Sequence, residues 1–308
     1  MSIQKKRQHK LVEKAPVVAA LLMCVLWSVL QQIIEFAVNY PLSLVISGND
    51  HISGPIGLIV SIAVMMLVYK RWFRPEFEGM LKGDMPKGFL LGLFELGFVI
   101  LSFLFSALAG YQIAPKPLSA QIISVSLAAG MSEELVFRGV ILSTLMRQWK
   151  DQKKYRTAAL VSGIIFGLLH AMNIFSGADP LGTLLQVIAA AGIGVIFSAV
   201  YLRTGSILPC MFYHTVHDVI AIAGSSGVTD SGIITASGFD REDMINLVLT
   251  AVLTAIAFYM LRDAKNEEMR AIWNRKWKPA EDAEEMNAGE VTSYVISNME
   301  SFAPNQTR

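Results

Sequence analysis

The stretch Met131–Gly139, Met-Ser-Glu-Glu-Leu-Val-Phe-Arg-Gly, places two carboxylates and a guanidinium inside a long apolar run. A charge near the centre of a bilayer costs at least ~2.5 kcal/mol on insertion scales, so these charges need partners. On a helix, Glu134 and Arg138 lie one turn apart and can pair. Glu133 then points about 100° away and is free to face another group. Taken alone, the pattern is equally consistent with a structural ion pair that holds a helix bundle together.

The composition of the 308-residue chain indicates an all-α, polytopic membrane protein. Hydrophobic residues make up 53% of the chain and its mean hydropathy is +0.48. A soluble domain has an apolar share of only ~45–50%, counted with glycine. The net charge of +1 gives no sign of nucleic-acid binding, so we expect no nucleic-acid partner. The two cysteines, Cys24 and Cys210, fall inside apolar runs and are expected to be free thiols.

The apolar runs predict a bundle of about eight transmembrane helices, each about 16–30 residues long against a usual need for ~20. Their expected bounds are 15–37, 53–69, 88–110, 118–146, 157–174, 182–202, 206–223 and 244–262. Loops rich in Lys and Arg alternate with loops that contain few or none. This alternation favours an integral membrane protein with both termini in the cytoplasm.

This pattern predicts that the chain is divided into three parts. They are a basic cytoplasmic N-terminus at 1–14, a transmembrane domain at 15–262 with its motif core at 118–223, and a cytoplasmic, disordered tail at 263–308. The tail is predicted from its acidic and polar composition. Trp273 and Trp277 stand among basic residues just after the last apolar run, so we expect them to lie at the membrane interface.

Small residues recur at helical spacing in two neighbouring runs. Gly163 and Gly167 form a Gly-x-x-x-Gly pattern, and the next run has a small residue at Ala190, Gly194 and Ser198. Such spacing lets two membrane helices approach closely. The pattern predicts tight packing of these two helices.

Histidine and aspartate side chains occur in two further apolar runs, at His170, His214, His217 and Asp218. At ~1.5 Å per residue, Glu133 and His170 lie about 20 Å, and His214 about 13 Å, from the cytoplasmic ends of their runs. The three runs can therefore meet at one level. A lone intramembrane histidine usually serves helix–helix hydrogen bonding, but this combination favours a functional site. His217 remains an alternative to His214.

The same residues allow two chemistries. Glu133 among apolar walls suits a general base or acid near neutral pH. Glu133, His170 and His214 are also candidate ligands of Zn²⁺, with an open position for water. The sequence contains no His-Glu-x-x-His, which excludes a standard zincin arrangement. The zinc mechanism and a metal-free mechanism both remain open.

Three motifs, in this order and on separate runs, resemble those of a known family. They are Glu-Glu-x-x-x-Arg (Glu133, Glu134, Arg138), Phe-x-x-x-His (Phe166, His170) and His-x-x-x-Asp (His214, Asp218). They are similar to the motifs of the CPBP family of CAAX proteases and bacteriocin-processing enzymes, also called Abi proteins. This family includes the type II CAAX prenyl endopeptidase. The resemblance covers about residues 118–223.

The resemblance implies hydrolysis of a peptide bond inside the membrane. By analogy with the family, Glu133 activates a water molecule with help from His170. His214 and Asp218 then bind or stabilise the oxyanion of the tetrahedral intermediate. His214 must be a hydrogen-bond donor for this, and Asp218, one turn away, is expected to fix its tautomer or keep it protonated.

The remaining motif residues have supporting roles in this picture. Glu134 and Arg138 hold the geometry of the site. Phe166 lies one turn before His170, where it can pack against the imidazole and help to exclude water, although plain helix packing explains it equally well.

The expected substrates are membrane-associated: prenylated CAAX proteins, peptide pheromones or bacteriocin leaders. The expected location is a prokaryotic cell membrane, and the oligomeric state is left undetermined. One rival interpretation is a catalytically silent membrane scaffold or regulator of the same family. A second is a proton-coupled transporter, which predicts broken helices and inverted repeats that the sequence does not display.

Overall fold

The computed structural model of the chain is a bundle of helices. It describes residues 11–45, 56–57, 59–67, 77–108, 116–224, 228, 239 and 241–277. Within these ranges the regular elements are all helical, and the β contacts include an isolated bridge between Phe77 and Trp277. The all-α class predicted from the sequence is therefore confirmed.

Helices make up most of the described chain. In chain order they are α2 (Pro16–Val45), α4 (Met85–Leu108), α5 (Ala120–Glu134), the π-helical η1 (Leu135–Leu142), α6 (Ser143–Trp149), α7 (Tyr155–His170), the 3₁₀-helical η2 (Ala171–Ser176), α8 (Pro180–Thr204), α9 (Leu208–Gly224), α10 (Arg241–Met260), the 3₁₀-helical η3 (Asp263–Lys265) and α11 (Asn266–Lys276). Residues 56–57 and 59–67 are also helical.

Five helices of the described chain are long and apolar enough to cross a membrane. They are Pro16–Leu42, Met85–Leu108, Tyr155–Ser176, Pro180–Thr204 and Asp243–Met260. They coincide with five of the expected spans, and the predicted total of about eight is not confirmed. The expected span 118–146 is divided among α5, η1 and α6, α9 has 17 residues, and 53–69 lies partly outside the described residues.

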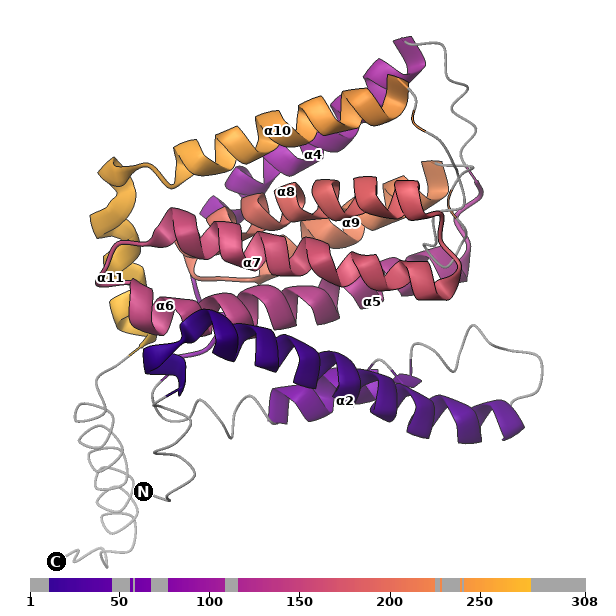
Figure 1. Cartoon of the computed structure of the whole chain (residues 1–308), viewed down its shortest axis with the longest axis horizontal. Coiled ribbons are helices and arrows are strands. Elements are labelled where there is room, and N and C mark those ends of the chain that lie inside the picture. The colour runs from indigo at the N-terminus through magenta and orange to yellow at the C-terminus, as the bar shows by residue number, and fades with distance from the viewer. Residues whose placement is uncertain are drawn as a thin grey trace, which may run out of the picture.

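The helices α8 and α9 lie in the middle of the bundle (Figure 1). α7 and α10 pack against α8, α4 lies beside α10 and α9, and α5 packs against α9. α2 forms the edge opposite α10 and contacts η1 and α6. α11 lies at the end of the bundle where α6 and the start of α7 are found (Figure 1).

The contact between α7 and α8 depends on glycine. A Cβ atom on Gly163 would lie 2.7 Å from the carbonyl oxygen of Ala191, and one on Gly167 would meet the Val187 carbonyl oxygen. Gly194 in turn faces the Cα atom of Gly163. The two backbones therefore approach too closely for larger residues, which confirms the packing predicted from the small-residue pattern.

The helix that carries the first motif widens at the motif itself. α5 begins at its N-cap Ser119, whose hydroxyl accepts from the Ile122 amide at 3.1 Å. Directly after Glu134 the backbone becomes π-helical. The Ser143 hydroxyl donates to the Arg138 carbonyl oxygen, five residues earlier, at 3.2 Å. Single π-helical turns inside α-helices are frequent at functional sites, and nothing in the sequence pattern predicted this one.

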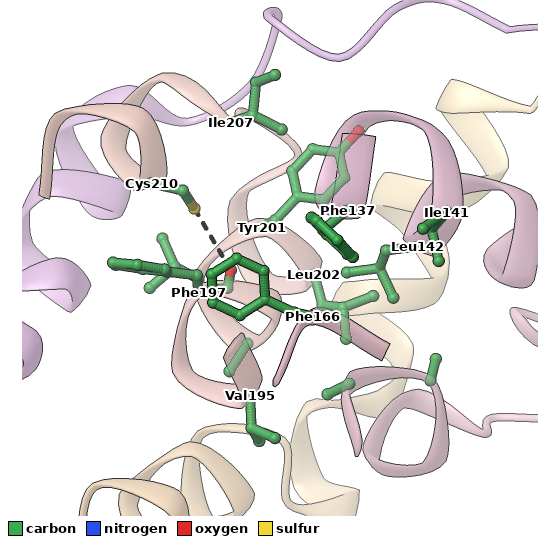
Figure 2. Packing of buried hydrophobic residues seen from close by; sticks show 14 of the residues in the cluster. Phe137, Ile141, Leu142, Phe166, Val195, Phe197, Tyr201, Leu202, Ile207 and Cys210 are labelled. Carbon is green, nitrogen blue, oxygen red and sulfur yellow. Dashed lines mark hydrogen bonds between the residues drawn. The ribbon is translucent and has the colours of Figure 1, made fainter. Parts of the chain in front are cut away.

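Aromatic rings form the core beneath the motifs (Figure 2). The rings of Phe137 and Phe166 meet edge to face, with centroids 5.0 Å apart, and Phe197 packs in the same cluster. The Cys210 thiol donates to the Phe197 carbonyl oxygen at 3.4 Å. Cys24 and Cys210 are both free and buried, as predicted.

The segment after the last long helix corrects two predictions. Residues 263–277, expected to be disordered, form η3 and α11 and the turn that follows. Trp273 and Trp277, expected at the membrane interface, are buried against the protein, with exposed fractions of 0% and 5%. Their indole N–H groups donate to backbone carbonyls, which makes burial favourable for these large rings. Residues 278–308 of the predicted tail lie outside the described residues.

Charged side chains of α4, α8 and α11 lie at this end of the bundle. We call Lys87, Arg203, Glu268 and Lys276 the end cluster. Arg203 donates from Nη2 to both carboxylate oxygens of Glu268 at 3.2 Å, and Lys87 pairs with the same carboxylate. Burial raises the pKa of the Glu268 carboxyl, but the hydrogen bond from Lys87 and the charge of Arg203 outweigh it and lower this pKa to about 2.

The lysine of the end cluster is bound by backbone oxygens. Lys276 is 3% exposed, and its ammonium donates to the carbonyl oxygens of Gly79 at 2.6 Å and Lys82 at 2.9 Å. Burial lowers the pKa of Lys276 to about 8. α11 is therefore attached to the segment before α4 by a partly desolvated cation.

Candidate active site

Side chains from three separate segments of the chain converge in the bundle. They are Glu133, Glu134 and Arg138 at the junction of α5 and η1, Phe166 and His170 at the end of α7, and His214 and Asp218 on α9. We call these seven residues the motif cluster. The sequence predicted that these segments meet, and the structure brings them together.

The most deeply buried part of the motif cluster is an ion pair. The Arg138 guanidinium donates from Nη1 to Glu134 Oε1 at 2.8 Å, and both side chains are 0% exposed. Its Nη2 donates to the Gly194 carbonyl oxygen at 3.0 Å. The guanidinium carbon also lies over the ring of Phe166, 4.7 Å from its centroid, and 5.5 Å from that of Phe197. The predicted pairing of Glu134 with Arg138 is confirmed.

The same carboxylate orients His214. The Nδ1–H group of His214 donates to Glu134 Oε1 at 3.0 Å, and Nε2 faces Glu133 Oε2 at 3.8 Å and Asp218 Oδ2 at 3.6 Å. Both distances at Nε2 exceed hydrogen-bonding range. From the sequence, Asp218 was expected to fix the tautomer of His214. In the structure, Glu134 makes the hydrogen bond that orients this ring. The reason is the packing of α5 against α9, which brings Glu134 to His214.

The two adjacent glutamates have different environments. The Glu134 side chain is 0% exposed, whereas the Glu133 side chain is 27% exposed and that of Asp218 is 22% exposed. The Oε2 atom of Glu133 is itself buried and has no hydrogen-bond partner among the described residues. Glu133 is therefore free to face another group, as its helical position predicted, and that group is His214.

His170 occupies the last position of α7, beside the same cluster. Its Nδ1–H group donates to the Phe166 carbonyl oxygen at 3.0 Å, one turn earlier. The Phe166 ring meets the His170 ring edge to face at 5.0 Å and the His214 ring at 5.7 Å. Phe166 thus packs between the two imidazoles. The described residues provide His170 with a hydrogen bond at Nδ1 and with none at Nε2.

A second histidine–carboxylate pair adjoins the site and was not predicted. The Nδ1–H group of His217 donates to Glu95 Oε1 at 2.6 Å, and Glu95 of α4 is fully buried. His217 therefore does not take the place of His214. The signal that could have identified this pair is Glu95 itself, the one carboxylate in the apolar sequence of α4.

Two histidines of the motif cluster have one feature of metal ligands. His170 and His214 each donate from Nδ1 to an oxygen, a pattern that suits imidazoles with a ligating Nε2. Within the described residues, however, no group of three or more His, Cys, Asp or Glu side chains is arranged to hold a metal ion. Zinc ligation by Glu133, His170 and His214 stays a prediction, and no step below depends on a metal.

Comparison with known proteins assigns the region that carries the cluster. Residues 115–220 match the family described as type II CAAX prenyl endopeptidase Rce1-like. This region is therefore similar to a CAAX prenyl endopeptidase domain. The match spans all seven residues of the motif cluster and confirms the family resemblance drawn from the three motifs. No curated protein and no solved structure gives a significant match to the chain. The matched family is a protease family, and the chain carries helices that are apolar enough to cross a membrane.

Proposed function

We propose that the protein is an intramembrane endopeptidase in which Glu133 activates the water that attacks a peptide bond. One observation carries the proposal. The Glu133 carboxylate is partly exposed and has a free oxygen 3.8 Å from His214, while its neighbour Glu134 is fully buried and paired. A carboxylate held free beside a fixed imidazole has the arrangement that general base catalysis requires.

In this mechanism Glu133 and His170 activate the attacking water molecule. With Nδ1–H committed to the Phe166 carbonyl, a neutral His170 ring presents the lone pair of Nε2 as an acceptor. A water molecule between the two side chains would lose one proton to Glu133 as it attacks the carbonyl carbon. Glu133 would return that proton to the leaving amine. General acid–base catalysis of this kind contributes about 10²–10⁴-fold to a rate.

The oxyanion is assigned to His214. Because Nδ1–H already donates to Glu134, a donor at Nε2 requires protons on both ring nitrogens. The carboxylates of Glu134, Glu133 and Asp218 surround this ring and supply the opposite charge. A preorganised donor to an oxyanion is worth roughly 2.7–4 kcal/mol of transition-state stabilisation. Asp218 then serves as counter-charge to His214, and Glu134 serves as its orienting partner.

The substrate class follows from the family and from the position of the site. The family name refers to CAAX prenyl endopeptidases, and the cluster lies among helices that are apolar enough to cross a membrane. We propose substrates held in or on the bilayer, either CAAX-type proteins or peptides with a leader. The chain would act in a prokaryotic cell membrane with both termini in the cytoplasm.

The test is cleavage of reporter peptides by the purified full-length protein in detergent. The peptides would include prenylated CAAX-type, unprenylated CAAX-type and leader-type sequences. Wild type is compared with Glu133→Gln and His170→Asn, each with and without a strong chelator. Asp151→Asn provides a matched control, since it makes the same carboxylate-to-amide change on a side chain that is 56% exposed and remote from the cluster in the fold.

We expect wild type and Asp151→Asn to cleave at least one peptide class and Glu133→Gln and His170→Asn to be inert. Loss of wild-type cleavage with the chelator, restored by Zn²⁺, would support the zinc ligands predicted from the sequence. Cleavage that survives the chelator would support the metal-free route. Folded wild type that cleaves no peptide class would contradict the proposal and favour a catalytically silent scaffold.

A further inference from the structure

The buried pair Glu95–His217 lies outside the three motifs and has no role in the steps above. Glu95 is the single ionisable side chain in the interior of α4 and is 0% exposed. His217 donates to it at 2.6 Å from the neighbouring helix α9. The ring of Phe98, also on α4, stacks on the His217 ring at 6.1 Å with an interplanar angle of 12°. The imidazole is therefore fixed both by a hydrogen bond and by a ring face.

Helix α9 is held by hydrogen bonds on two sides, one made by this pair and one made in the motif cluster. On α9, His214 and His217 point in directions that differ by about 60°. His214 bonds to Glu134 of α5, and His217 bonds to Glu95 of α4. Rotation of α9 about its own axis would lengthen at least one of these two hydrogen bonds. The rotation of α9 sets where His214 Nε2 and Asp218 lie relative to Glu133.

Close packing against α4 also fixes the position of α9 along its own axis. The Tyr213 hydroxyl donates to the Phe89 carbonyl oxygen at 2.7 Å. A Cβ atom on Gly92 would run into the Tyr213 ring, so the absence of a side chain there lets α9 approach. On the opposite side of α9, Gly130 of α5 gives the same room to Thr215. Helix α9 thus lies in a narrow slot between α4 and α5, and the hydrogen bonds of His214 and His217 add to what holds its rotation.

We propose that Glu95 is a positioning residue that acts through His217. Its carboxylate holds α9 in the rotation that presents His214 and Asp218 to Glu133. This inference rests on the proposed function, because it assigns Glu95 a part in the same reaction. It predicts that the acceptor oxygen at position 95 matters more than the negative charge, since the hydrogen bond sets the rotation.

The test uses three substitutions in the full-length protein. Glu95→Gln keeps an acceptor oxygen for His217, whereas Glu95→Leu has a similar size and no acceptor. Leu93→Ala is the matched control on α4, at a side chain that is 49% exposed. For Glu95→Leu we expect kcat to fall about 10–100-fold, the usual loss when a supporting partner of a site is removed, with KM unchanged. Glu95→Gln should restore kcat to within about threefold of wild type, and Leu93→Ala should match wild type.

The partner substitution His217→Phe completes a cycle. It keeps a ring against Phe98 and removes the donor. The double variant with Glu95→Leu should be no slower than the slower single variant, because both changes remove one interaction. Wild-type kcat in Glu95→Leu, or a loss that follows the folded fraction alone, would overturn the proposal.

A spectroscopic readout separates this proposal from the proposed function. In protein labelled with ¹⁵N-histidine, the His214 ring signals, assigned with a His214→Gln sample, should shift in Glu95→Leu and stay in place in Glu95→Gln. This holds whether or not any peptide is cleaved. If wild type cleaves nothing while the His214 signals respond as expected, the protease proposal fails and the positioning role stands. Unchanged His214 signals in Glu95→Leu would refute the positioning role by itself.

Discussion

Two arginine–glutamate pairs, each with a buried arginine, lie at different places in this bundle and have different roles. In the motif cluster, Arg138 bonds to Glu134 at 2.8 Å and to the Gly194 carbonyl oxygen. In the end cluster, Arg203 bonds to Glu268 at 3.2 Å and to the Met260 carbonyl oxygen. The two guanidinium groups thus make the same kinds of bonds.

The difference lies in what the two carboxylates do next. Glu268 accepts a further hydrogen bond from Lys87. An ammonium group can only donate, so this network ends at Lys87 and serves to hold the helices together. Glu134 accepts from His214, whose second nitrogen faces the unpaired Glu133. An ion pair of this kind therefore supports a reaction only when one of its partners orients a side chain that keeps a nitrogen or oxygen atom available for the substrate or water. Four experiments test this contrast, taken from the largest expected effect to the smallest.

The largest effect is expected where the network keeps a free oxygen. Glu133→Gln should lower kcat/KM by about 10²–10⁴-fold, because it removes the general base. Its melting temperature in detergent should stay close to that of wild type, since Glu133 Oε2 has no hydrogen-bond partner among the described residues. Cleavage assays on protein matched for folded fraction measure the first effect. A variant that cleaves like wild type would remove Glu133 from the chemistry.

The neighbouring glutamate should affect stability instead. Glu134→Ala leaves the fully buried Arg138 without a carboxylate, so the free energy of unfolding should fall by about 3–5 kcal/mol. Glu133→Ala should lower it by about 1 kcal/mol or less, as expected for a change away from such networks. Denaturant or thermal unfolding in detergent provides the comparison. Equal losses for the two alanine variants would erase the distinction between the two glutamates.

Lys276 of the end cluster should make the stability of the protein depend on pH. Lys276 has a pKa of about 8 in the folded protein and an ordinary value of 10.5. Below about pH 8 both states carry the charge, and its burial weakens the folded state. From about pH 8 to 10.5 the folded state loses its proton first, so stability should rise with pH by up to about 1 kcal/mol per pH unit. Melting temperatures across this range should show the rise in wild type, and Lys276→Met should flatten it. The same slope in both proteins would contradict the assignment to Lys276.

The smallest effect is expected at Asp218. Asp218→Asn keeps the shape of the side chain and one acceptor oxygen, and the aspartate oxygen lies 3.6 Å from His214 Nε2, outside hydrogen-bonding range. Glu133 and Glu134 still supply negative charge beside His214, so activity should change by about threefold or less. Initial cleavage rates at several substrate concentrations will show whether this holds. Inactivity as complete as that of Glu133→Gln would mean that the charge of Asp218 takes part directly in the reaction.

The local features of the site were predictable from the sequence. The one-turn spacing of Glu134 and Arg138 set their pairing, and the angular offset of Glu133 left it free, because helix geometry fixes the directions of neighbouring side chains. The glycines of α7 and α8 predicted their close approach for the same reason. Apolar composition predicted membrane helices, and the order of three short motifs predicted the family.

Only the tertiary structure decided which partner each polar group chose. His214 has carboxylates at similar distances on three residues, and the packing of α5 against α9 selected Glu134 for its Nδ1 atom. Glu95 and His217 are separated by more than a hundred residues, so no local pattern connects them. The burial of Trp273 and Trp277 likewise depends on carbonyl groups that α8 and α6 expose at their ends. Spacing along a helix is determined by the chain itself, whereas contacts between helices depend on how their surfaces fit.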